Sequence, residues 1–379
     1  MDRFRADSDS CQWEDGRDKV TAQGSEGRPV TPTEKRPWEG RLTWTGDEIP
    51  SLYGLRGLVA MAVVLSHLGL TAVNAIYSVI CFFVLSGFLI TYLLLREIDK
   101  TGDISLRRFY CRRTLRIFPA FYVYAAVYVT LKSLMHHEVE WPAVMACLTY
   151  TGNYYFSITG HPDSTMAHTW SLAVEEQFYL LWPFIVWRLR GNRPLLIRVL
   201  IGAIVGVWAY RWFAASAHFE DFYVFAAFET RADALGIGCL IAVANREGCL
   251  PRWIVEWKWL APVGLVALAV SSAIQLNGPR YSWTLVALVF AVVLVQAVAH
   301  AHTVWYRFLN SRPFYLLCLI SYSLYLYHPF ANNLPERFHI LAVGVPVAIL
   351  LATGSYWIVE RPFLNLKDRL FSVSKSATR

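Results

Sequence analysis

An arginine and a histidine stand eleven residues apart in one apolar stretch, LRGLVAMAVVLSHL, which runs from Leu55 to Leu68. In an α-helix, eleven residues turn through about 1100°, some 20° from three full turns, and rise about 16 Å. Arg56 and His67 therefore share one helix face. A guanidinium fork suits phosphate, and a neutral imidazole can accept a proton. The spacing suits a pantetheine arm, so it predicts a coenzyme A thioester held at its charged end by Arg56 and delivered to His67.

Two plainer explanations of this pair stay open. An arginine near a helix end often only extends its charge to the membrane interface. A buried histidine often only bonds a neighbouring helix. Ionisable groups inside membrane segments are nevertheless costly, and function is their usual explanation.

The stretch TWSLAVEEQFYLLWPF places two carboxylates, Glu175 and Glu176, in an apolar segment. If the segment enters from the outer side, Glu175 lies about 7–9 Å inside the boundary, at a depth similar to that of His67. A carboxylate beside an imidazole orients the ring and stabilises its protonated form. We therefore expect Glu175 to orient His67, whereas favourable charge at a helix start accounts for Glu176.

Two further groups are assigned to donor binding. Ser86 and Gly87, in FFVLSGFLI, are small enough for either helix packing or close approach of a ligand. No G-x-S-x-G frame surrounds Ser86, which disfavours a nucleophilic role. The arginines of RRFYCRRTLR either set the topology or attract a phosphate-rich donor; those assigned to the donor are Arg112, Arg113 and Arg116.

Polar residues also occur deep in later segments. Arg231 and Asp233 in FETRADALGIG either pair with other helices or line a cavity, since neither can be left unpaired in lipid. Tyr325 and His328 in SYSLYLYHPF belong either to an interfacial aromatic belt or to an acceptor-binding wall suited to sugar faces.

The composition indicates what kind of helices must position these groups. The chain has 379 residues, 55% of them hydrophobic, and only 17% are charged. Its mean hydropathy is +0.36. Apolar runs of about 17–25 residues, enough to cross a bilayer, recur between Leu52 and Val359. The seven scattered cysteines show no metal or disulfide spacing. This predicts an all-α polytopic membrane bundle of about ten spans.

Basic loops predict that both termini are cytosolic. The segment Trp141–Tyr155 must then stay on one side, as an interfacial or re-entrant piece. We expect three parts: a disordered cytosolic extension over 1–49, a transmembrane domain over 50–362 and a cytosolic tail over 363–379. The net charge of +7 reflects this topology and not a nucleic-acid partner.

The chain resembles the acyltransferase 3 family of bacterial membrane O-acyltransferases. The resemblance lies in LYGLRGLVAMAVVLSHL, FFVLSGFLI, RRFYCRRTLRIFPAFY, HTWSLAVEEQFYLLWPF, TRADALGIGCLIA, ISYSLYLYHPF and VERPF, in the family's order. It implies a ten-span fold that transfers acyl groups, often acetyl, from coenzyme A to sugar hydroxyls. The family's arginine, histidine and glutamate match Arg56, His67 and Glu175. Tyr53 departs from the acidic residue common at that position, and we expect no esterase-like C-terminal domain.

These observations together predict a multi-pass O-acyltransferase of the bacterial cytoplasmic (inner) membrane. His67 acts as general base, Glu175 orients it, and Arg56 holds donor phosphates. Acyl-CoA, acetyl-CoA first, is the co-substrate; no permanently bound cofactor or metal is expected, and the partners are a carbohydrate acceptor and the bilayer. The alternative is an ion- or proton-coupled transporter that uses the same intramembrane charges, although no inverted repeat supports it.

Overall fold

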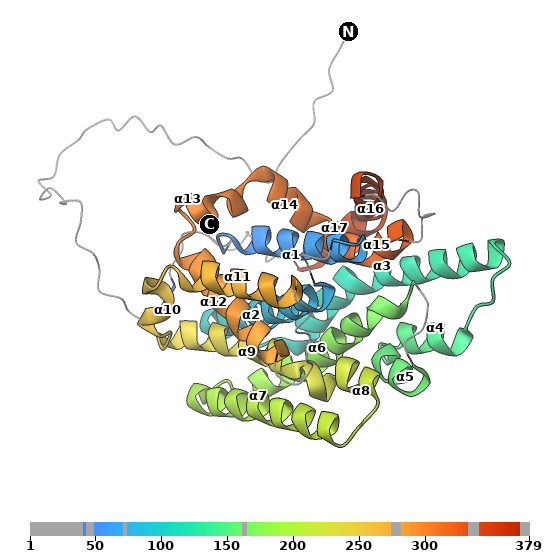
Figure 1. The fold of residues 1–379 in the computed structure, drawn as a ribbon. Coiled ribbons are helices and arrows are strands. Elements are labelled where there is room, and N and C mark those ends of the chain that lie inside the picture. Colours follow the sequence, from blue (N-terminus) through green and yellow to red (C-terminus); the bar gives the residue numbers. More distant parts are fainter. Residues whose placement is uncertain are drawn as a thin grey trace, which may run out of the picture. The chain divides into compact units, whose positions relative to one another are not determined.

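The computed structural model describes residues 41–42, 49–70, 74–160, 165–273, 282–332 and 341–371. Every regular element in these residues is a helix, as the apolar runs predict (Figure 1). Most of the predicted N-terminal extension lies outside the described residues. Two of its later residues are packed, since Leu42 and Ile49 are buried and the Leu42 amide donates to Asn245 Oδ1 at 2.6 Å.

The helices of the first half run in the order α1 Leu52–His67, α2 Ala75–Thr101, α3 Leu106–Leu134, α4 Trp141–Leu148, α5 Gly152–Thr159, η1 Ala167–Thr169, α6 Trp170–Leu189 and α7 Arg193–Ser216. The second half contains α8 Asp221–Ala226, α9 Phe228–Glu247, α10 Arg252–Glu256, α11 Leu260–Ala273, α12 Ser282–Ala299, α13 Val304–Arg307, η2 Phe308–Asn310, α14 Arg312–Leu319, α15 Ser321–Asn332, α16 Leu341–Ser355, η4 Tyr356–Glu360 and α17 Arg361–Phe371.

Within the described residues, four helices are long and apolar enough to cross a membrane: α2, α3, α7 and the continuous helix over 342–371. The pair α14 and α15, bent by 73°, is a fifth candidate. The ten predicted spans are therefore not confirmed. α1, for example, has 16 residues, which is about 24 Å against a hydrocarbon core of about 30 Å. The segment Trp141–Tyr155 forms α4 and the start of α5, each 8 residues long and too short to cross.

Close backbone contacts fix α2 against α9. A Cβ on Gly87 would overlap the carbonyl oxygen of Leu235, and a Cβ on Gly238 would overlap that of Val84. Small residues allow this approach, as is common between membrane helices. α6 is joined to α2 by the Trp182 indole, which donates to Thr91 Oγ1 at 2.8 Å in a buried site. These contacts hold α2 and α6, the helices that carry Ser86 and Glu175, in a fixed relation.

α1 is placed by a second set of glycines. A Cβ on Gly54 would overlap the main chain of Leu309, and one on Gly57 would lie 2.9 Å from the carbonyl oxygen of Phe314. α1 therefore packs tightly on η2 and α14, with Arg56 between the two glycines in sequence. α17 packs on the N-terminal half of α3, where the Arg112 guanidinium lies 5.6 Å from the Phe371 ring centre.

Candidate active site

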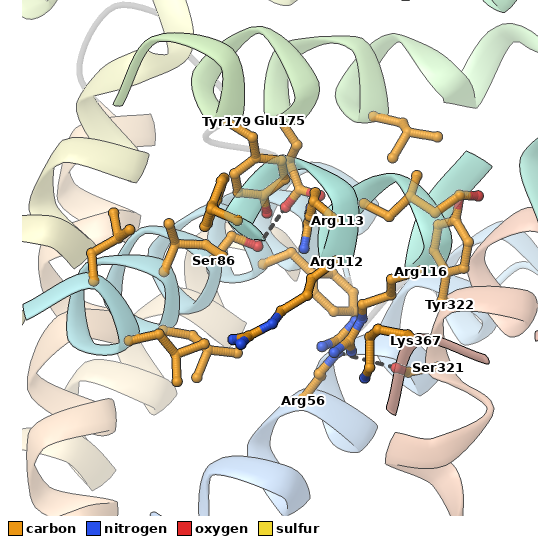
Figure 2. A pocket seen from close by; sticks show the side chains of 18 of the residues that line it. Arg56, Ser86, Arg112, Arg113, Arg116, Glu175, Tyr179, Ser321, Tyr322 and Lys367 are labelled. Carbon is orange, nitrogen blue, oxygen red and sulfur yellow. Dashed lines mark hydrogen bonds between the residues drawn. The ribbon is translucent and has the colours of Figure 1, made fainter. Parts of the chain in front are cut away.

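A cavity of about 750 Å³ opens between α1, α2, α3, α6, α15 and α17. Its volume lies in the range of small-molecule sites. Figure 2 shows two groups of side chains in it: Ser86, Glu175 and Tyr179 lie together, and Arg56, Arg116, Ser321 and Lys367 form a second group. The cavity therefore has a carboxylate and hydroxyl side and a cationic side.

The cationic side collects arginines and lysines from four helices. The basic residues that line the cavity are Arg56, Arg96, Lys100, Arg108, Arg112, Arg113, Arg116 and Lys367, against three acidic ones, Glu97, Glu175 and Asp368. Arg56 Nε donates to Ser321 Oγ at 3.1 Å, and this bond aims its guanidinium at the cavity (Figure 2). Such an excess of positive charge favours a polyanion and guanidinium groups suit phosphate. The structure thus brings together all four arginines assigned to the donor.

Ser86 and Glu175 form a hydrogen-bonded pair at the other side. Ser86 Oγ donates to Glu175 Oε1 at 2.6 Å, and Tyr179 lines the cavity beside this pair (Figure 2). The Arg113 guanidinium lies 3.5 Å from the centre of the Tyr179 ring. The same arginine lies 3.6 Å from Glu176 Oε1, an ion pair that the helix-start explanation of Glu176 did not foresee.

His67 lies outside this cavity, at the exposed C-terminal end of α1. Its Nδ1 bonds the Val63 carbonyl at 2.9 Å, and its ring centre lies 4.8 Å from that of His328. The structure therefore does not bring Glu175 to His67: Glu175 bonds Ser86, and His67 meets a histidine. The expectation of a Glu175–His67 pair failed because similar depth in two helices does not fix which faces meet.

His67, His328 and His168 form a histidine cluster, in which the ring of His328 contacts the other two. The ring centres of His168 and His328 are 5.2 Å apart, and the Nε2 atom of buried His328 has no hydrogen-bond partner. Burial, followed by the nearby His67, lowers the pKa of His168 to about 3, so this ring is neutral at physiological pH. In the part of the chain that the structure describes, no three histidine, cysteine or carboxylate side chains are arranged to hold a metal ion.

Tyr325 is the point where the cavity meets the histidine cluster. Its side chain lines the cavity, and its hydroxyl donates to the His168 carbonyl oxygen at 2.6 Å. Its own carbonyl accepts from His328 Nδ1 at 2.7 Å. The same hydroxyl lies 2.9 Å from Ser171 Oγ. The interfacial belt is therefore not the whole account of these two residues, since His328 is buried in the bundle and half-buried Tyr325 lines the cavity.

Besides His67 and His328, three further predicted residues do not line the cavity: Gly87, Arg231 and Asp233. Asp233 forms a buried ion pair at 3.0 Å with Arg211, which lies on α7. The Arg231 guanidinium is buried with its carbon 3.5 Å from the Trp283 ring centre, and its Nε donates to a main-chain carbonyl. Gly87 packs against α9 and does not line the cavity.

Sequence reasoning missed the contribution of α17. Lys367, Asp368 and Phe371 line the cavity, although the segment was expected to be a tail. A signal was available in RPFLNLKDRLF, where apolar residues recur at intervals of three and four among charges, as in an amphipathic helix. Tyr179 was also missed, because nothing in one sequence distinguishes it from other aromatic residues of α6.

Comparison with known proteins supports a specific family. The model of the acyltransferase domain family matches residues 49–359. The peptidoglycan O-acetyltransferase OatA of Listeria monocytogenes is 28% identical over 343 residues, which are 83% of this chain and 54% of that protein. The O-acetyltransferase OatA of Staphylococcus aureus is 26% identical over 359 residues, 86% of this chain and 58% of that protein. The chain thus spans about half the length of these relatives, and no solved structure matches it.

Proposed function

Because this chain belongs to the acyltransferase domain family, we propose that it is a membrane-bound O-acetyltransferase that moves an acetyl group from acetyl-CoA to a sugar hydroxyl. The observation that carries the proposal is the cavity of about 750 Å³, with basic side chains on one side and a serine–carboxylate pair on the other. Family membership speaks against the transporter alternative.

The cationic side is proposed to bind the phosphates of the donor. Arg56, Arg112 and Arg116 line one cavity with Lys367, so a ligand with several phosphates would meet several cations at once. The thioester end would then extend toward Ser86 and Glu175. Charge-assisted bonds from arginine to phosphate are stronger than neutral ones, and this matches the donor assignment of the three arginines.

The histidine cluster is proposed to serve the acceptor. His67 is exposed, whereas His328 behind it is buried. A neutral imidazole can take the proton of an attacking hydroxyl, so His67 is the proposed general base. Both relatives are named as O-acetyltransferases, one of them of peptidoglycan, and a glycan of the bacterial surface is the proposed acceptor class. The enzyme would act in the cytoplasmic membrane.

The test uses the purified full chain in lipid nanodiscs. Thiol release from acetyl-CoA is followed with and without oligomers of N-acetylhexosamine, and mass spectrometry identifies acetylated sugar. We expect saturable acetyl-CoA binding and acceptor-dependent acetyl transfer. If the wild-type chain neither binds acetyl-CoA nor releases thiol, the proposed function is wrong.

A further inference from the structure

Several hydroxyl groups line the cavity, and their hydrogen-bond partners distinguish Ser86 from the others. Tyr325 and Tyr322 donate to main-chain carbonyl oxygens at 2.6 and 3.0 Å. Ser321 accepts from an arginine. Among the described residues that line the cavity, Ser86 is the hydroxyl that donates to a carboxylate, that of Glu175, at 2.6 Å. A hydroxyl within this distance of a base has the arrangement of an activated nucleophile.

The surroundings of the pair support that chemistry. The next residue, Gly87, locks α2 against the main chain of α9, so Ser86 is held on a rigid element. Glu175 and Arg113 face the same cavity. The Arg113 guanidinium lies beside the pair (Figure 2) and supplies positive charge where an oxyanion would develop during attack on a carbonyl.

We infer that Ser86 receives the acetyl group from acetyl-CoA, with Glu175 as its general base, so that transfer passes through an acetyl-serine. This inference rests on the proposed function and adds a catalytic pair to it. As Ser86 Oγ bonds the thioester carbon, its proton moves to Glu175; the carbon–sulfur bond breaks, and the sulfur leaves with that proton as free coenzyme A. In the second half, the acceptor oxygen bonds the acetyl carbon, the bond to Oγ breaks, and the acceptor's proton is returned to Oγ.

The test is a trapping experiment on the full chain in nanodiscs. Wild type, Ser86→Ala, Glu175→Gln and Ser78→Ala are incubated with acetyl-CoA labelled in the acetyl group, without acceptor, and protein-bound label and thiol release are measured. Ser78 is the matched control, since it lies on the same helix, outside the cavity, and donates to the carbonyl of Asn74. Acetyl-CoA binding and thermal unfolding of each variant confirm that it is folded.

The expected result is about one label per wild-type and Ser78→Ala chain, located on Ser86 by peptide mass spectrometry, with an equal burst of thiol. Ser86→Ala should bind acetyl-CoA but carry no label, and Glu175→Gln should label about 100-fold more slowly, the usual order of general-base effects. The inference is overturned if wild type acetylates an acceptor without carrying label, or if folded Ser86→Ala transfers acetyl at the wild-type rate. Wild type that neither binds nor cleaves acetyl-CoA overturns the proposed function itself.

Discussion

At the residue scale, Arg56 carries the clearest prediction about the donor. Its guanidinium is fixed by Ser321 and faces a cavity with seven other basic side chains. Arg56→Gln should raise KM for acetyl-CoA about tenfold or more and change kcat less, because one charge-assisted bond of about 1.5–3 kcal/mol is lost. Steady-state thiol release measures both constants. Arg361→Gln, whose guanidinium stacks on Trp357 outside the cavity, is the control; equal KM changes in both variants would contradict the assignment.

His67 carries a prediction that separates the two half-reactions. Because it lies outside the donor cavity, His67→Gln should leave acetyl-CoA binding and acceptor-free labelling intact. Transfer to the acceptor should fall about 100-fold, since the hydroxyl loses its base. Label on the protein and acetylated product are measured in parallel. Loss of labelling in this variant would show that His67 acts on the donor and would contradict the separation.

The residues also show which inferences one sequence permits. Arg56 and His67 could be placed on one helix because local helix geometry fixes their spacing. The partner of Glu175 could not be predicted, because that depends on how α6 rotates against α2 and α1. The hydrogen bond from Ser86 joins residues 89 positions apart, and no local pattern encodes such a distance.

At the element scale, the close contact between α2 and α9 fixes the position of α2, the helix that carries Ser86. Gly87→Ala would push a methyl group into the Leu235 carbonyl, and such overpacking costs about 1–3 kcal/mol. We expect a lower Tm in detergent and weaker labelling of Ser86. Gly206→Ala on α7 is the control, since nothing lies within 4 Å of its added Cβ. An unchanged Tm in Gly87→Ala would mean that the two helices can separate without cost.

α17 carries a second prediction at this scale. Lys367 lines the cavity, whereas Arg369 on the same helix does not. Lys367→Glu should therefore weaken acetyl-CoA binding about tenfold or more, because a charge that attracts phosphate becomes one that repels it. Isothermal titration with acetyl-CoA checks this, and Arg369→Glu should bind as wild type does. If both variants bind equally, α17 is not part of the donor site.

The helices themselves were largely predictable, and their lengths and pairings were not. Apolar runs indicated the positions of α2, α3 and α7 because a long run of such residues favours a helix in lipid. The bend of 73° between α14 and α15 left no comparable pattern. Residues 363–379 were expected to form a cytosolic tail, and the apolar spacing that favours α17 was not considered.

At the scale of the whole molecule, the cavity and the N-terminal extension can be tested separately. The described residues that line the cavity lie between Arg56 and Phe371, all of them inside the compact unit over residues 39–379. Deletion of residues 2–38 should therefore leave KM and kcat for acetyl-CoA within about twofold of wild type, an energy change below about 0.5 kcal/mol, as for changes away from a site.

The cut preserves Leu42, whose amide bonds Asn245 on α9. Deletion of residues 2–48 removes that bond and Leu42 itself, so it should lower Tm where the shorter deletion does not. A loss of acetyl-CoA turnover in the shorter deletion at unchanged Tm would assign the extension a part in the reaction.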